Sequence, residues 1–196
     1  MQINLKDTET KSHEGRSLLF SYAGFILPAS LGVFLLPILV GFLGPERFSL
    51  FTTLFVIGIF LVSLDFGISA SITRQTSKAL ATKNQSYASE IIGTGLSLMF
   101  VLGIIIFFGG MAVNEIYLIK NINLELVSID EFNWAFIAIC FGVIPTLLTS
   151  ALRGGLEGRQ IFIAASILRI LSGSIALVAP IILAFFVTKL DYIFWF

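Results

Sequence analysis

The chain has 196 residues, of which 57% are hydrophobic and only 12% are charged, whereas a soluble domain carries about 25% charged residues. Its 12 basic and 12 acidic side chains cancel, so it lacks the basic excess with which nucleic-acid-binding proteins displace counterions. This composition argues against a soluble domain, excludes nucleic acid as a partner, and predicts an integral membrane protein.

Long apolar stretches follow a polar tail, residues 1–16, which we expect to be cytoplasmic. A helix needs about 20 apolar residues to cross a bilayer. The chain is therefore expected to be an all-α, polytopic membrane helix bundle over 17–196, with five transmembrane helices and the start of a sixth. The expected spans are about 17–43, 48–73, 91–114, 132–152, 161–188 and, truncated, 192 onward. Because an apolar run begins at 192 and stops after a few residues, we expect the N-terminal part of a longer transporter.

The basic residues that flank these spans predict the orientation, because they resist translocation across the membrane. Two alternate sets of connections carry unequal numbers of them. One set holds Lys6, Lys11, Arg16, Arg74, Lys78, Lys83, Arg153 and Arg159, and the other holds Arg47, Lys120 and Lys189. The richer set is expected inside, so we predict a multi-pass protein of the plasma membrane with a cytoplasmic N-terminus.

No residue pattern of an enzyme, a metal site or a cofactor site is found. The lone His13 lies in the polar tail, without the carboxylates or cysteines that a metal site or a nucleophile and base pair requires. Cys140 lies in an apolar run and is interpreted as a packing residue. The glycines at 93, 95, 109 and 110 are attributed to close helix packing, as is the small-xxx-small pair Gly67 and Ser71.

Asp65 and Arg169 are the two ionisable residues expected inside the membrane, where a charge is costly unless it faces water, a partner or a substrate. Their positions on antiparallel spans give them comparable depth, so they are expected to be able to face each other. Two readings stay open. In one, the pair only fixes two helices together, or Arg169 extends to the interface. In the other, Arg169 binds an anionic head group and Asp65 is its counter-charge or a cation site.

Arg16, Arg74 and Arg153 are expected around the same cytoplasmic mouth as this pair. Each is a further candidate for substrate binding or translocation. For each, the ordinary alternative is that it serves only as a topology signal.

Three stretches resemble segments of the polysaccharide-repeat-unit flippases. They are Leu-Gly-Pro-Glu-Arg-Phe at 43–48, Leu64-Asp65-Phe66-Gly67 running to Arg74, and Ala151-Leu-Arg-Gly-Gly-Leu-Glu-Gly158 followed by Phe162 and Arg169. They are similar to the family's signatures around helices one and two and between helices four and five. One position departs from the pattern, because Gly41 stands where related proteins often have an arginine.

This resemblance implies the multidrug/oligosaccharidyl-lipid/polysaccharide exporter superfamily, in which two six-helix lobes enclose a central cavity. The chain would be most of the first lobe. Members move undecaprenyl-diphosphate-linked oligosaccharide repeat units across the bacterial inner membrane by alternating access, for surface polysaccharide such as O-antigen. The implied partners are this substrate, membrane lipids, the C-terminal lobe of the same protein and the polysaccharide polymerase machinery.

Two alternatives to a flippase remain. A multidrug/cation antiporter of the same superfamily has a similar layout, but it favours an acidic and aromatic cavity. A non-transporting membrane scaffold subunit would be complete at this length, and Asp65 would then have no role in transport.

Overall fold

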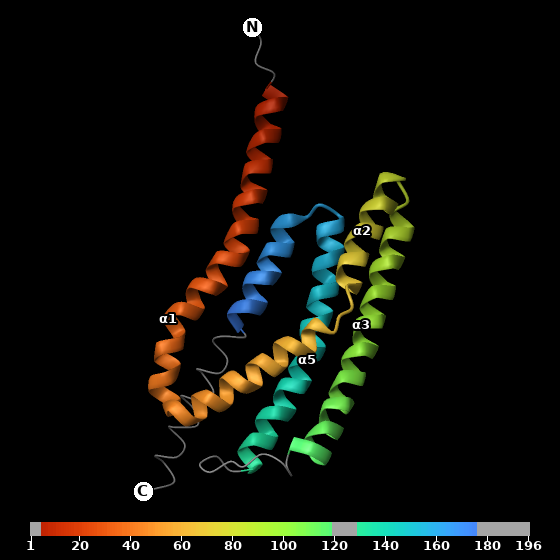
Figure 1. Ribbon diagram of the computed structural model, residues 1–196. Helices are drawn as coiled ribbons and strands as arrows, with labels where there is room; N and C mark the ends of the chain where they lie inside the picture. Colours follow the sequence, from red (N-terminus) through yellow and green to blue (C-terminus); the bar gives the residue numbers. More distant parts are fainter. Residues whose placement is uncertain (1–4, 119–128, 176–196) are drawn as a thin grey trace, which may run out of the picture.

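The computed structural model describes residues 5–118 and 129–175, and every regular element in these two ranges is a helix (Figure 1). The expectation of an all-α fold is therefore confirmed for this part of the chain. The elements are, in chain order, α1 (Leu5–Ser63), α2 (Ile68–Ala81), α3 (Gln85–Val113), the π-helix η1 (Asn114–Leu118), α5 (Ile129–Gly158) and a last helix, Phe162–Ile175.

Three helical segments in the described ranges are long and apolar enough to cross a membrane. They are Phe48–Ala81, Gln85–Ile116 and Phe132–Gly158. Two shorter apolar helical segments also occur, Ala29–Gly41 within α1 and Phe162–Ile175 at the end of the described range. The predicted count of five spans and the start of a sixth is thus not reached. Part of the predicted fifth span, 161–188, and the whole segment from 192 onward lie outside the described residues.

The first helix, α1, comprises two helices joined at a sharp bend. It begins at Leu5, so most of the expected polar tail is helical. Gly44 inside it has φ 73° and ψ 165°, a conformation that is open essentially to glycine alone. Pro45 follows, and its fixed φ suits the first position of a new helix. The chain reverses its course here, so the second half of α1 runs back toward α5 and α2 (Figure 1).

A break interrupts the predicted second span, which was expected to be continuous over 48–73. The helix ends at Ser63 and resumes at Ile68, because Phe66 and Gly67 both adopt positive φ angles, 50° and 74°. The carboxylate of Asp65 accepts a hydrogen bond from the Gly67 N–H over 3.0 Å, which stabilises this turn. The helix then continues to Ala81, beyond the expected end.

The helices α2 and α5 lie side by side and run in the same direction. Three hydroxyl groups of α2 donate hydrogen bonds to three backbone carbonyls of α5, each partner lying 81 residues further along the chain. The pairs are Ser69 to Ser150 at 2.9 Å, Thr73 to Gly154 at 3.1 Å, and Ser77 to Gly158 at 3.1 Å. Because both sets recur every fourth residue, one face of each helix is in register with the other.

Glycines on α5 allow this close approach. A Cβ atom added at Gly154 would lie 2.7 Å from the Ser69 carbonyl oxygen, and one added at Gly158 would lie 2.8 Å from the Thr73 carbonyl oxygen. Such small residues are what membrane helices use to bring backbones together. On α3, Gly95 and Gly110 are similarly packed. At Gly67, Gly93 and Gly109, no atom of the described residues lies within 4 Å of an added Cβ. The described residues thus give no helix contact at Gly67, Gly93 or Gly109, in contrast to the expectation, and Gly67 serves the turn instead.

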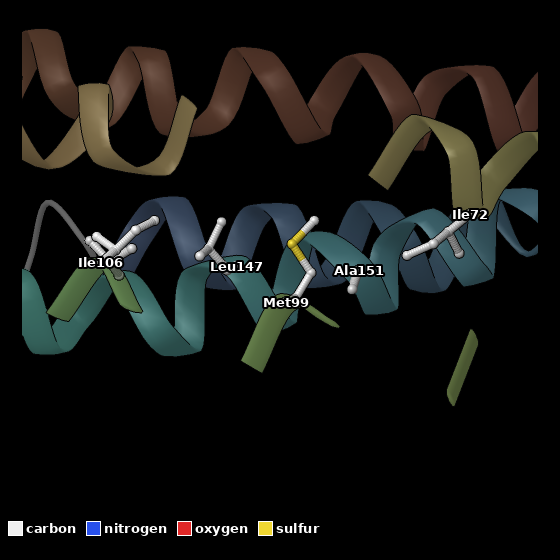
Figure 2. Packing of buried hydrophobic residues seen from close by; sticks show 6 residues of the cluster. Ile72, Met99, Ile106, Leu147 and Ala151 are labelled. Carbon is white, nitrogen blue, oxygen red and sulfur yellow. The ribbon is translucent and has the colours of Figure 1, made fainter. Parts of the chain in front are cut away.

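The apolar core lies between α2, α3 and α5. Figure 2 shows its labelled side chains in a row along α5. Its buried members are Ile72, Met99, Ile106, Val143, Leu147 and Ala151. A second cluster joins the latter half of α1 to the start of α5 through Leu54, Phe132, Phe136 and Cys140. Cys140 is fully buried there, which confirms that it is a packing residue.

One end of the bundle gathers most of the described basic residues. The turn between α2 and α3 lies at this end, together with the turn after α5 and the start of α1 (Figure 1). The bend inside α1 and the start of α5 lie at the other end (Figure 1). This arrangement matches the alternation of the predicted topology, while the side of the membrane that each end faces stays a prediction.

The outer surface of the bundle is apolar. Phe34, Phe66 and Trp134 are among its exposed large side chains, with relative exposures of 74%, 78% and 74%. A soluble monomer rarely exposes apolar patches on this scale. Together with the three long apolar helices, this surface indicates a membrane location.

The α2–α5 contact predicts that Gly154→Ala destabilises the protein. The new methyl group would collide with the Ser69 backbone, which cannot rotate away, so the helices must separate at a cost of about 1–3 kcal/mol. Thermal unfolding of the purified protein in detergent measures this loss. Gly142→Ala, also on α5 but with nothing within 4 Å of the added Cβ, is the matched control. Equal unfolding temperatures for the two variants would contradict the packing described here.

The break at 64–67 predicts that Gly67→Val is destabilising, although no atom of the described residues lies within 4 Å of an added Cβ. A β-branched residue at φ 74° costs about 1–3 kcal/mol. Gly93→Val is the control, because Gly93 lies within the regular helix α3 and its added Cβ also meets nothing within 4 Å. Thermal melts followed by circular dichroism compare the stability of the two variants. If the helix were continuous through Asp65, both variants would unfold at the same temperature.

Candidate functional site

The structure gives Asp65 and Arg169 different partners from the expected ones. Asp65 lies in the 64–67 break, where its carboxylate accepts from its own turn. Arg169, on the helix Phe162–Ile175, donates to Glu157 of α5. Within residues 5–118 and 129–175, no ion pair joins Asp65 to Arg169. The expected facing pair is therefore replaced by a pair with Glu157.

Two arginines converge on one carboxylate oxygen. Arg169 Nη2 lies 2.9 Å from Glu157 Oε1, and Arg153 Nε lies 3.7 Å from the same oxygen. The side chains of Arg153, Glu157 and Arg169 are 32%, 29% and 19% exposed. We call these three residues the Arg153–Glu157–Arg169 cluster. It carries a net charge of +1 by simple addition of its formal charges.

The end of α5 positions the cluster. Arg153 and Glu157 are four residues apart, so they share a face of the helix. After Gly158 the chain turns, with Gln160 at φ 61° and the Ile161 N–H donating to the Leu156 carbonyl over 2.9 Å. This turn sends the next helix back along α5 (Figure 1), which places Arg169 beside Glu157. Arg159 fixes the same turn to α3, because its Nη2 donates to Ser89 Oγ over 2.9 Å.

The first half of α1 forms another wall beside the cluster. A Cβ atom added at Gly24 would lie 3.5 Å from Arg169 Cδ and 3.6 Å from Ser166 Cβ. Ser166 is buried, with 2% exposure. These are ordinary van der Waals distances, so α1 lies directly against the stem of Arg169. The cluster lies where three helices meet.

The remaining predicted site residues divide between the cluster and other places. Arg153 belongs to the cluster. Arg74 is exposed on α2. Arg16 lies in α1, and its side chain is outside the part that the structure describes. Of the arginines expected around one cytoplasmic mouth, the structure thus brings together only Arg153 and Arg169 among the described side chains.

Sequence reasoning missed Glu157. The sequence does contain a signal, because Glu157 follows Arg153 by one helical turn within the stretch 151–158 that resembles the flippases. Glu157 lies outside the predicted spans, whereas Asp65 and Arg169 lie within them and are conspicuous for that reason. A carboxylate at a helix end is common in any sequence, and its role becomes visible only when the structure shows the next helix folding back on it.

A groove of about 310 Å³ lies between α2 and α3, away from the cluster. Its polar lining residues are Ser71, Gln75, Tyr87, Glu90 and Thr94, and its floor is apolar. Gln75 donates to Ser71 within it over 2.9 Å. Among the described residues, no group of three or more histidine, cysteine, aspartate or glutamate side chains is placed to hold a metal ion. The cluster at the end of α5 is therefore the stronger candidate for recognition of a charged ligand.

Comparisons with known proteins return no match: none of the protein-family models, the curated proteins or the solved structures is similar to this chain. The resemblance to polysaccharide-repeat-unit flippases stays a prediction that depends on the sequence motifs alone.

Proposed function

We propose that the protein is a flippase that translocates an undecaprenyl-diphosphate-linked oligosaccharide repeat unit across the bacterial inner membrane by alternating access. In this proposal the chain supplies five spans and the start of a sixth of the N-terminal lobe, with a cytoplasmic N-terminus. The single observation that supports it best is the convergence of Arg153 and Arg169 on one partly exposed point, the Glu157 carboxylate. The protein acts as a transporter and not as an enzyme.

The chemistry of the arginines fits a diphosphate. Guanidinium groups form short, charge-assisted hydrogen bonds with phosphate oxygens, and their planar donor arrangement suits two oxygens at once. Arg153 and Arg169 come from two different helices, so a diphosphate held between them would bind both. A ligand that bridges two helices stabilises one arrangement of those helices over another, which is what alternating access requires.

The alternative of a cation antiporter is less favoured by the same cluster. An organic cation is attracted to an acidic or aromatic cavity, whereas Glu157 is outnumbered by two arginines. A scaffold without transport activity requires no charged cluster where three helices meet. The α2–α3 groove, with Glu90 at its edge, does not favour either alternative specifically.

The proposal is tested by flipping in proteoliposomes. The full-length protein is reconstituted with a fluorescent undecaprenyl-diphosphate-linked oligosaccharide, and its movement between leaflets is followed by the quenching of accessible dye. Arg153→Gln and Arg169→Gln are each expected to lower the initial rate at least about tenfold, because each removes a charged hydrogen-bond donor.

Lys78→Gln is the matched control, because Lys78 is an exposed basic residue of α2 outside the cluster. It is expected to keep the rate of the unmodified protein. A protein that is folded and inserted, but that moves no more lipid-linked oligosaccharide than empty vesicles do, would reject the flippase.

A further inference from the structure

The geometry of Glu157 resembles that of a bound anion. A single carboxylate oxygen, Oε1, lies 2.9 Å from one guanidinium and 3.7 Å from another. The two arginines repel each other electrostatically, so the carboxylate between them compensates that repulsion. Glu157 therefore occupies the position that the phosphate of an anionic ligand would take.

We propose that Glu157 is a built-in counter-anion, and that the phosphate groups of the ligand bind to Arg153 and Arg169 by displacing its carboxylate. This inference is based on the proposed function for the identity of the ligand, a lipid-linked diphosphate. It adds a role for Glu157, which competes with the ligand for the two arginines and does not itself contact the ligand.

Displacement is physically accessible because the cluster is not sealed. About a third of the Arg153 side chain and slightly less of Glu157 are exposed, at 32% and 29%. Ion pairs in such surroundings are weak, since water and salt screen them. A phosphate, with more negative charge and more acceptor oxygens than a carboxylate, competes well for the same donors.

The charge balance favours exchange in both directions. With Glu157 in place the three formal charges sum to +1, and with its carboxylate turned away the two arginines present +2. The vacated site attracts a diphosphate more strongly than the closed cluster does. When the ligand leaves, Glu157 returns and again neutralises one charge, so the empty site is not left as a pair of repelling cations.

Competition of this kind lowers the apparent affinity. The dissociation constant is raised by the reciprocal of the fraction of molecules in which the site is open. Removing the carboxylate charge removes this competitor from the site. If the carboxylate fills the site nine times in ten, Glu157→Gln is expected to tighten binding about tenfold.

The experiment measures the binding of inorganic pyrophosphate to the purified full-length protein by isothermal titration calorimetry. Glu157→Gln keeps the size of the side chain and a carbonyl acceptor for Arg169, but it removes the charge. It is expected to bind pyrophosphate about tenfold more tightly than the unmodified protein, while Arg169→Gln binds more weakly. Glu90→Gln, at an exposed carboxylate of α3, is the matched control and is expected to change nothing.

Glu157→Asp provides a second variant in case glutamine at this position lowers the yield of folded protein. Its carboxylate is one methylene shorter, so we expect it to hold the two arginines less strongly and pyrophosphate to bind more tightly than in the unmodified protein. Thermal melts identify the folded variants. Equal or weaker pyrophosphate binding by the folded Glu157 variants would overturn the counter-anion role.

The two proposals fail in different assays. Flipping that depends on Arg153 and Arg169, without tighter pyrophosphate binding in Glu157→Gln, would reject the counter-anion and retain the flippase. Tighter pyrophosphate binding in a protein that moves no lipid-linked oligosaccharide would retain the counter-anion and reject the flippase.

Discussion

The arrangement of the bundle depends on the close approach of α2 to α5. In a bilayer, lipid tails are as apolar as the helix surfaces, so apolar burial gives the helices little reason to associate. Backbone proximity and hydrogen bonds must supply that reason. Gly154 and Gly158 remove the side chains that would keep the two helices apart, and the hydroxyls of Ser69, Thr73 and Ser77 bond across the gap.

This contact also determines where the charged cluster stands. The face of α5 that carries Gly154 and Gly158 is occupied by α2, which leaves Arg153 and Glu157 on another part of the same helix. The last helix folds back over that part. The tight α2–α5 interface and the partly exposed charged cluster therefore share one short stretch of α5. A change that loosens this interface is expected to displace the cluster.

Much of the fold follows from hydropathy. The helical nature of the chain, and the approximate positions of α3 and α5, are evident from apolar runs whose length matches a bilayer. The break at 64–67 is not evident, because hydropathy is insensitive to backbone dihedrals and Leu-Asp-Phe-Gly is mostly apolar. Gly67 is ambiguous in the sequence. With Ser71 four residues later it fits a helix contact, but a glycine is also typical of a turn.

The candidate site was predicted in part for a similar reason. Arg169 stands out in an apolar sequence, and so does Asp65. Their partners depend on how the chain turns at 159–161 and at 64–67, and those turns are determined by a few backbone angles. Depth along a helix can be counted from a sequence, whereas the direction in which a side chain points around the axis requires the packing of its neighbours.

The 81-residue separation of the α2–α5 hydrogen bonds has a consequence during synthesis. At about 5–20 residues per second, the carbonyls of α5 are made roughly 4–16 s after the hydroxyls of α2. In that interval α2 has no α5 beside it in the membrane. Thr73 is suited to the delay, because its hydroxyl also bonds the Ser69 carbonyl of its own helix at 3.1 Å. The nascent helix thus satisfies this hydroxyl internally and shares it with α5 once that helix has been inserted.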